Sequence, residues 1–224
     1  MTRETLDRKI EEILAEVILL GSMVEQATLN AIKALNSLDQ KEARKVYKGD
    51  TPINEKRFEL EERTVMTIAT QQPMARDIRV LTSILEVITE LERMGDYAKG
   101  IGRINLNIGR DSKLQPPPEL LRMAEIGVDM LHQALQAFVA GDAQSARKIP
   151  PLDDQVDELF KQVLRGILDS MASDPSAIDE YNHLLWAAHN LERLADRVTN
   201  ICERTIYIDT GKLLELDASD DEQN

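Results

Sequence analysis

The sequence predicts an all-α protein built from two tandem three-helix bundles related by an internal duplication. Three observations lead to this prediction: the composition, long runs of apolar residues at helical spacing, and a repeat that spans most of the chain. Hydrophobic residues make up 42% of the 224 residues, whereas aromatic residues make up only 4%. This composition suits long helices packed through aliphatic side chains, because strands favour aromatic and β-branched residues.

The first helix is predicted by a stripe of apolar residues near the N-terminus. Spacings of four and three residues alternate for more than four heptads, which is the pattern of a coiled-coil seam. At about 1.5 Å per residue the helix would be about 50 Å long, with its stripe in the core. The stripe consists of Leu6, Ile10, Ile13, Val17, Leu20, Val24, Ala27, Ala31, Ala34 and Leu38.

The second helix is expected over residues 39–70, with an interruption near residues 49–52. Pro52 suits the first turn of a restarted helix, because proline has no backbone N–H to donate. Asp50 or Thr51 would then cap the restarted helix. We therefore expect two helical pieces in this part of the chain.

A repeat relates the two halves of the chain. Residues 31–54 match residues 134–157 at an offset of 103, and residues 85–101 match residues 185–201 at an offset of 100. A repeat unit of this length, used only twice, indicates that a whole three-helix bundle was duplicated.

The third helix of the first bundle is expected over residues 74–108, and the segment after it, which is rich in proline, is a linker. The end of the chain is acidic and has no apolar periodicity, so we expect it to be disordered. The chain therefore divides into a first repeat (1–110), a linker (111–118), a second repeat (119–210) and a disordered tail (211–224).

Charge and cysteine content exclude several classes of function. The net charge of −13 at pH 7 argues against nucleic acid or anionic lipid as the main partner, since both require clustered Lys and Arg. Cys202 is the only cysteine, so neither an intrachain disulfide nor a thiolate metal cage can form. No run approaches the roughly 20 apolar residues of a membrane span. We expect a cytoplasmic protein without direct membrane insertion.

An acidic motif, Glu-Arg-x-[Gly/Ala]-Asp, occurs in the last helix of each repeat. Glu92 and Asp96 are four residues apart, as are Glu192 and Asp196, and Asn200 adds a further oxygen-bearing side chain one turn later. Like charges at this spacing cost a few tenths of a kcal/mol in an isolated helix, so their presence in both repeats predicts a bound cation. Carboxylate and amide oxygens suit iron or another hard cation such as Mg, Mn or Ca, with zinc as a further candidate.

The alternative is that these carboxylates are ordinary surface charges. Arg93 could pair with Asp96, and Arg193 with Asp196, as common i,i+3 ion pairs. The protein would then be a metal-free helical adaptor or scaffold. The metal content of the purified protein distinguishes the two interpretations.

A helical metalloenzyme is an alternative of another class. A ferritin-like di-iron site needs two Glu-x-x-His motifs and two further Glu residues. Glu180 and His183 form one such motif, and no second exists among the three histidines. We assign His183 and His189 to the packing or the surface of the last helix. Since no phosphate-cradling loop or nucleophile motif occurs, we expect no enzymatic activity.

Three segments, residues 71–79, 91–99 and 191–201, resemble the signature stretches of the PhoU family of phosphate transport regulators. The resemblance extends over residues 6–208. It implies two three-helix bundles, a homodimer, and metal clusters on acidic Glu/Asp-x-x-x-Asp motifs. It also implies that the protein docks to the ATPase subunit of the Pst phosphate transporter, to a phosphate sensor histidine kinase, or to both, and represses phosphate-starvation signalling.

The metal ligands that the resemblance implies are Glu92, Asp96, Glu192, Asp196 and Asn200. Gly100 stands where the family often has Asn, so if only one repeat holds metal we expect it to be the second. Asp77 belongs to the family motif of the first repeat, but its aligned partner is Ala177. Asp77 is therefore either a metal ligand or an ion-pair partner of Arg residues near the start of its helix.

Overall fold

The computed structural model describes residues 3–110 and 112–216, and this part of the chain contains helices and no strands. The first bundle consists of α1 (Arg3–Asn36), α2 (Gln40–Gln71) and α3 (Arg76–Ile108). The second consists of α4 (Glu119–Ala140), α6 (Asp153–Ser173) and α7 (Ile178–Thr210), with the short elements α5 (Ala143–Ala146), η1 (Pro150–Leu152) and η2 (Pro175–Ala177) between them. The predicted fold of two three-helix bundles is confirmed.

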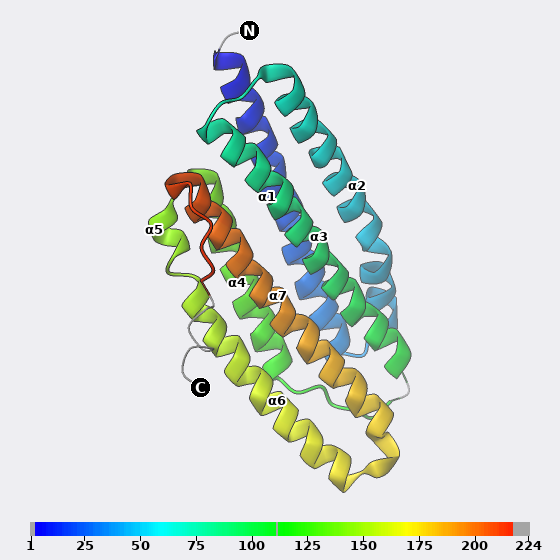
Figure 1. The fold of residues 1–224 in the computed structure, drawn as a ribbon. Helices are drawn as coiled ribbons and strands as arrows, with labels where there is room; N and C mark the ends of the chain where they lie inside the picture. The colour runs from blue at the N-terminus through cyan, green and yellow to red at the C-terminus, as the bar shows by residue number, and fades with distance from the viewer. Residues whose placement is uncertain (1–2, 111, 217–224) are drawn as a thin grey trace.

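The two bundles lie side by side and share one core. α3 packs against α7, and α1 packs against α4, while α2 and α6 lie on opposite outer sides (Figure 1). The apolar stripe of α1 faces this core, as predicted, and Val17, Leu20 and Val24 are fully buried. Apolar side chains from both repeats belong to the same buried cluster.

The duplication extends to the caps of the helices. Asp39 accepts hydrogen bonds from the backbone N–H groups of Lys41 and Glu42 at the start of α2. Asp142, its partner at an offset of 103, caps α5 in the same way. Such a side chain satisfies N–H groups that have no partner within the helix.

The predicted interruption of the second helix is wrong, because α2 runs without a break through Pro52. Asp50, one turn before the middle of α2, is buried, and so is Ile53. The burial of these two residues in the bundle outweighs the cost of a proline inside a helix, which is about 3 kcal/mol. In the second repeat the corresponding helix is divided into α5 and α6, with Pro150 and Pro151 at the division.

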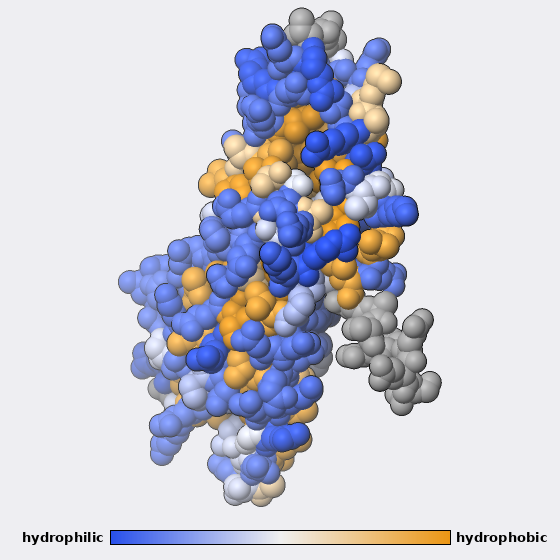
Figure 2. Space-filling model, turned by 90° about the vertical axis from the view of Figure 1, so that its left-hand side faces the viewer, coloured by the Kyte–Doolittle hydropathy of each residue, from blue (hydrophilic) through white to orange (hydrophobic). Residues whose placement is uncertain are grey.

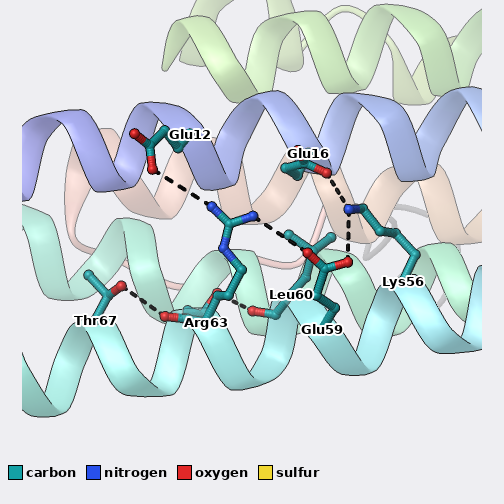
Figure 3. Close-up of polar contacts among 8 residues, drawn as sticks. Glu12, Glu16, Lys56, Glu59, Leu60, Arg63 and Thr67 are labelled. Carbon is teal, nitrogen blue, oxygen red and sulfur yellow. Dashed lines mark hydrogen bonds and ion pairs between the residues drawn. The ribbon is translucent and has the colours of Figure 1, made fainter.

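Charged side chains connect α1 to α2 on the outside of the first bundle. Lys56 forms ion pairs with Glu16 of α1 and with Glu59, the second at 3.0 Å. Arg63 lies between Glu12, at 3.8 Å, and Glu59, at 3.7 Å (Figure 3). These ion pairs add to the apolar packing between α1 and α2, although exposed pairs of this kind contribute only about 0–1 kcal/mol each.

The face of the molecule shown in Figure 2 is mostly hydrophilic, with hydrophobic side chains gathered in patches between the hydrophilic ones. None of the helices within residues 3–110 and 112–216 has the length and apolar character needed to cross a membrane. The predicted disordered tail lies mainly outside the described residues. Its described part, up to Leu216, is not helical, and the backbone N–H of Leu216 donates to Glu203.

Candidate functional site

The first acidic cluster lies between α2 and α3 and consists of Asp50, Asn54, Glu92 and Asp96. Lys99 of α3 reaches into it, and its Nζ lies 2.6 Å from Asp50 Oδ2 and 3.6 Å from Asp96 Oδ1. Asn54 Nδ2 donates to the same Asp50 oxygen at 2.8 Å. The cluster therefore contains an internal cation that joins the two helices.

The electrostatics of Glu92 show that the carboxylates share one region. Burial raises the pKa of Glu92, and the negative charges of Asp96 and Asp50 raise it further. The positive charges of Arg57 and Arg93 act in the opposite direction. A positive charge placed near these carboxylates would therefore stabilise the ionised form of Glu92.

Two buried oxygen atoms of this cluster lack a hydrogen-bond donor among the residues that the structure describes. They are Asp50 Oδ1 and Asn54 Oδ1. The side chain of Asp50 is only 5% exposed, so water does not readily reach it. Buried oxygens without donors are uncommon in proteins, so these two atoms are free to accept a further donor or a cation.

We call the aligned residues of the second repeat, Asp153 and Asp157 on α6 and Glu192 and Asp196 on α7, the second acidic cluster. These residues align with Asp50, Asn54, Glu92 and Asp96 of the first cluster. α6 packs against α7 as α2 packs against α3. His189 Nδ1 lies 3.0 Å from Glu192 Oε2, so a histidine borders the second cluster.

Asn200, the fifth predicted ligand, is half-buried on α7. Its aligned position in the first repeat is Gly100. A Cβ atom at Gly100 would lie 2.9 Å from Nδ2 of Asn190 on α7. Position 100 thus faces the other repeat, and the absence of a side chain there lets α3 and α7 approach each other.

In the first repeat, the ion pairs of the acidic motif differ from those that the sequence predicts. Arg93 pairs with Glu90, at 2.9 Å, and Asp96 with Lys99, so the proposed pair between Arg93 and Asp96 is wrong. Arg193 lies over the ring of Tyr97, with 5.3 Å between its Cζ and the ring centroid. These contacts direct arginines toward the interface of the repeats.

Asp77 forms an ion pair, but its partner is at the start of α1. Arg3 Nη1 and Nη2 donate to the two carboxylate oxygens of Asp77 at 2.6 and 2.9 Å. The pair joins the beginnings of α1 and α3, at some distance along the helix from the first acidic cluster. Glu180, from the single Glu-x-x-His motif, accepts a hydrogen bond from Ser112 of the linker.

Within residues 3–110 and 112–216, no three His, Cys, Asp or Glu side chains lie close enough together to hold a metal ion. The acidic motif in the sequence predicts the carboxylates of α3 and α7 but not their neighbours on α2 and α6. The sequence does not show that Lys99 enters the first cluster, or that His189, assigned to the packing or the surface of its helix, lies against Glu192. The match of Asp50 and Asn54 with Asp153 and Asp157 in the repeat marks these positions as candidates. The sequence does not show, however, that they lie beside the acidic motif, because that depends on how α2 is aligned against α3.

Comparison with known proteins gives a consistent result. A family model described as the PhoU domain matches residues 17–104 and 120–205. A phosphate-specific transport system accessory protein PhoU homolog from Clostridium acetobutylicum is 32% identical over 217 residues, which cover 96% of this chain and 99% of the relative. The Escherichia coli accessory protein PhoU is 34% identical over 207 residues, 91% of this chain and 85% of the relative.

Solved structures agree with the sequence matches. The crystal structure of the phosphate transport system regulatory protein PhoU from Streptococcus pneumoniae has a TM-score of 0.86 and 29% identity, and the match covers 93% of this chain and 99% of that chain. PhoU from Pseudomonas aeruginosa has a TM-score of 0.84 and 30% identity, with 92% and 99% covered.

Proposed function

The chain belongs to the PhoU family, and from this premise we propose that it is an accessory regulator of a phosphate-specific transport system. It acts in the cytoplasm, without catalysis, and represses phosphate uptake and starvation signalling when phosphate is plentiful. The observation that carries the proposal is the match of both repeats to a family whose relatives are named for this transport system.

The regulator works by docking, as a homodimer, to the ATPase subunit of the transporter, to a phosphate sensor histidine kinase, or to both. Long helices joined through one core provide a rigid surface for such contacts. Several large apolar side chains lie exposed on this surface, including Phe58, Met66 and Trp186. Exposed aromatic and Met side chains are typical of protein interfaces.

The second acidic cluster binds a hard metal cation in this proposal, through Glu192 and Asp196 with Asp153, Asp157 or Asn200. The proposal is supported by the chemistry of these side chains, because carboxylate and amide oxygens are the ligands that hard cations prefer. Since no three acidic side chains of the described residues lie within reach of one ion as they stand, binding would draw the side chains of α6 and α7 together. A cation there would link α6 to α7 and neutralise part of the negative charge. By mass action it would also stabilise the folded state.

The metal is tested by elemental analysis of the protein purified without added metal. We expect stoichiometric metal in the unaltered protein and none in the Glu192→Ala/Asp196→Ala variant. Glu125→Ala/Asp129→Ala on α4 is the matched control, since it removes an exposed pair at the same spacing. Absence of metal from the unaltered protein would leave a metal-free adaptor.

Docking is tested by co-purification with the isolated ATPase subunit and with the cytoplasmic part of the sensor kinase. Binding to at least one of the two is expected, and a chelator should weaken it. Binding that a chelator leaves unchanged supports the metal-free adaptor, and binding to neither protein contradicts the docking proposal.

A further inference from the structure

We propose that the ammonium group of Lys99 takes the place of a metal ion in the first acidic cluster, so that only the second cluster binds metal. The inference rests on the proposed metal binding of the second repeat. It further predicts that removing the charge of Lys99 creates a metal site in the first repeat.

The position of the Lys99 ammonium is the first support. It is within 2.6 Å of an oxygen of Asp50 on α2 and within 3.6 Å of an oxygen of Asp96 on α3. A metal ion shared by the two helices would meet the same carboxylates. Like any lysine side chain in contact with carboxylates, this group carries a positive charge at neutral pH.

The charges of the two clusters differ in the way that this inference requires. The first cluster has three carboxylates, one amide and Lys99. The second has four carboxylates, and Thr199 stands at the position that aligns with Lys99. Arg57, whose positive charge acts on Glu92, aligns with Phe160. The second repeat therefore lacks both of the cationic side chains that the first repeat has at these positions.

Two oxygen atoms of the first cluster are available to a cation. Asp50 Oδ1 and Asn54 Oδ1 are buried and lack donors among the described residues. An ammonium group has three N–H donors and one charge, whereas a cation such as Mn²⁺ or Mg²⁺ is surrounded by about six oxygen atoms. Without Lys99, the carboxylates would be left close together and without their counter-charge.

The test uses the full chain with the second cluster disabled by Glu192→Gln and Asp196→Asn. Titration with Mn²⁺ in a calorimeter should detect no site in this background. Adding Lys99→Ala should create one site per chain, and adding Asp50→Asn should remove it again. Lys99→Arg, which keeps the charge, is the matched control and should create none.

Thermal unfolding with and without Mn²⁺ gives a second measurement. The ion should raise the Tm of the Lys99→Ala variant and leave that of the Lys99→Arg variant unchanged. Lys99→Met, which keeps the aliphatic part of the side chain, replaces Lys99→Ala if the latter does not fold. If neither folds, an Mn²⁺ ion bound to the unaltered chain and lost on Asp50→Asn would overturn the inference, and its absence would support it.

The outcomes separate this inference from the proposed function. If the unaltered protein binds no metal but the Lys99→Ala variant gains a site, metal binding at the second cluster is contradicted and the role of Lys99 is supported. If the unaltered protein binds one ion at the second cluster and the Lys99→Ala variant gains no site, metal binding at the second cluster is supported and the role of Lys99 is contradicted.

Discussion

At the scale of single residues, the ion pair between Lys56 and Glu16 is expected to make stability depend on pH. The hydrogen bond from Lys56 lowers the pKa of Glu16, and the burial of Glu16 only partly opposes this. A carboxyl group with a lowered folded-state pKa stabilises the fold above its unfolded pKa, and the stabilisation is lost as the pH falls through the folded pKa. The contribution of Glu16 is therefore complete at neutral pH and declines below about pH 4.5.

We expect Glu16→Gln to reduce the free energy of unfolding at pH 7 by up to about 1 kcal/mol, the range of partly exposed ion pairs. The difference from the unaltered protein should disappear as the pH is lowered through and below 4. Urea unfolding at a series of pH values measures this. Glu12→Gln is the control, because Glu12 is 52% exposed and 3.8 Å from Arg63, and it should change little. A difference that persists at low pH would contradict the assignment.

At the scale of a helix, the glycines of α2 and α3 have different roles. A Cβ atom at Gly102 would lie 3.1 Å from the backbone oxygen of Ala43 and 3.3 Å from Val46. Glycine there allows α3 to approach the backbone of α2. Gly49 is also inside a helix, but nothing lies within 4 Å of its Cβ position.

The two glycines should therefore respond differently to substitution. Gly49→Ala should stabilise the protein by about 0.5–1 kcal/mol, because alanine is the better helix former. Gly102→Val should destabilise it by about 1–3 kcal/mol, because the helices must move apart. Chemical denaturation of both variants tests this, and equal effects would show that α2 and α3 are not in close contact at Gly102.

Pro52 tests whether α2 is continuous. In an unbroken helix Pro52→Ala restores a backbone donor and should stabilise the protein by about 1–3 kcal/mol. Pro175→Ala is the control, since Pro175 is at the start of η2, where the N–H has no helical partner. If α2 were interrupted as the sequence suggested, Pro52→Ala would be neutral or destabilising.

At the scale of the whole molecule, the shared core predicts that the two repeats unfold as one unit. Gly21 of α1 faces Leu135 of α4, so that a Cβ atom at Gly21 would clash with the tip of that side chain. Leu135 is 2% exposed. The contact joins the first repeat to the second, and its loss should weaken both.

We expect Leu135→Ala to cost about 2–5 kcal/mol and to lower the Tm of a single unfolding transition. Calorimetry and circular dichroism should detect the same transition. Leu168→Ala is the control, since Leu168 is exposed on α6. Two separate transitions, of which only one shifts, would show that the repeats unfold independently.

How far the sequence predicts this molecule depends on the range of the contacts involved. The stripe of α1 and the repeat are patterns in the sequence itself, and each can be identified without knowing how the helices pack. The cap predicted at Asp50 or Thr51 is wrong, because α2 begins at Gln40 with Asp39 as its cap. Asp50 with Lys99, and Gly100 with Asn190, are distant in sequence and depend on how helices align. The break predicted at Pro52 is wrong because Asp50 and Ile53, on either side of it, are buried in the bundle. This burial outweighs the tendency of proline to interrupt a helix.

We propose that this chain represses phosphate-starvation genes when phosphate is plentiful. The most direct measurement is the activity of a starvation-induced transporter promoter, in high phosphate, in the organism that encodes the chain. Deleting the coding sequence should leave the promoter active, and a plasmid copy of the unaltered chain should restore repression. A promoter that stays repressed after the deletion, with unchanged phosphate uptake, would contradict the claim.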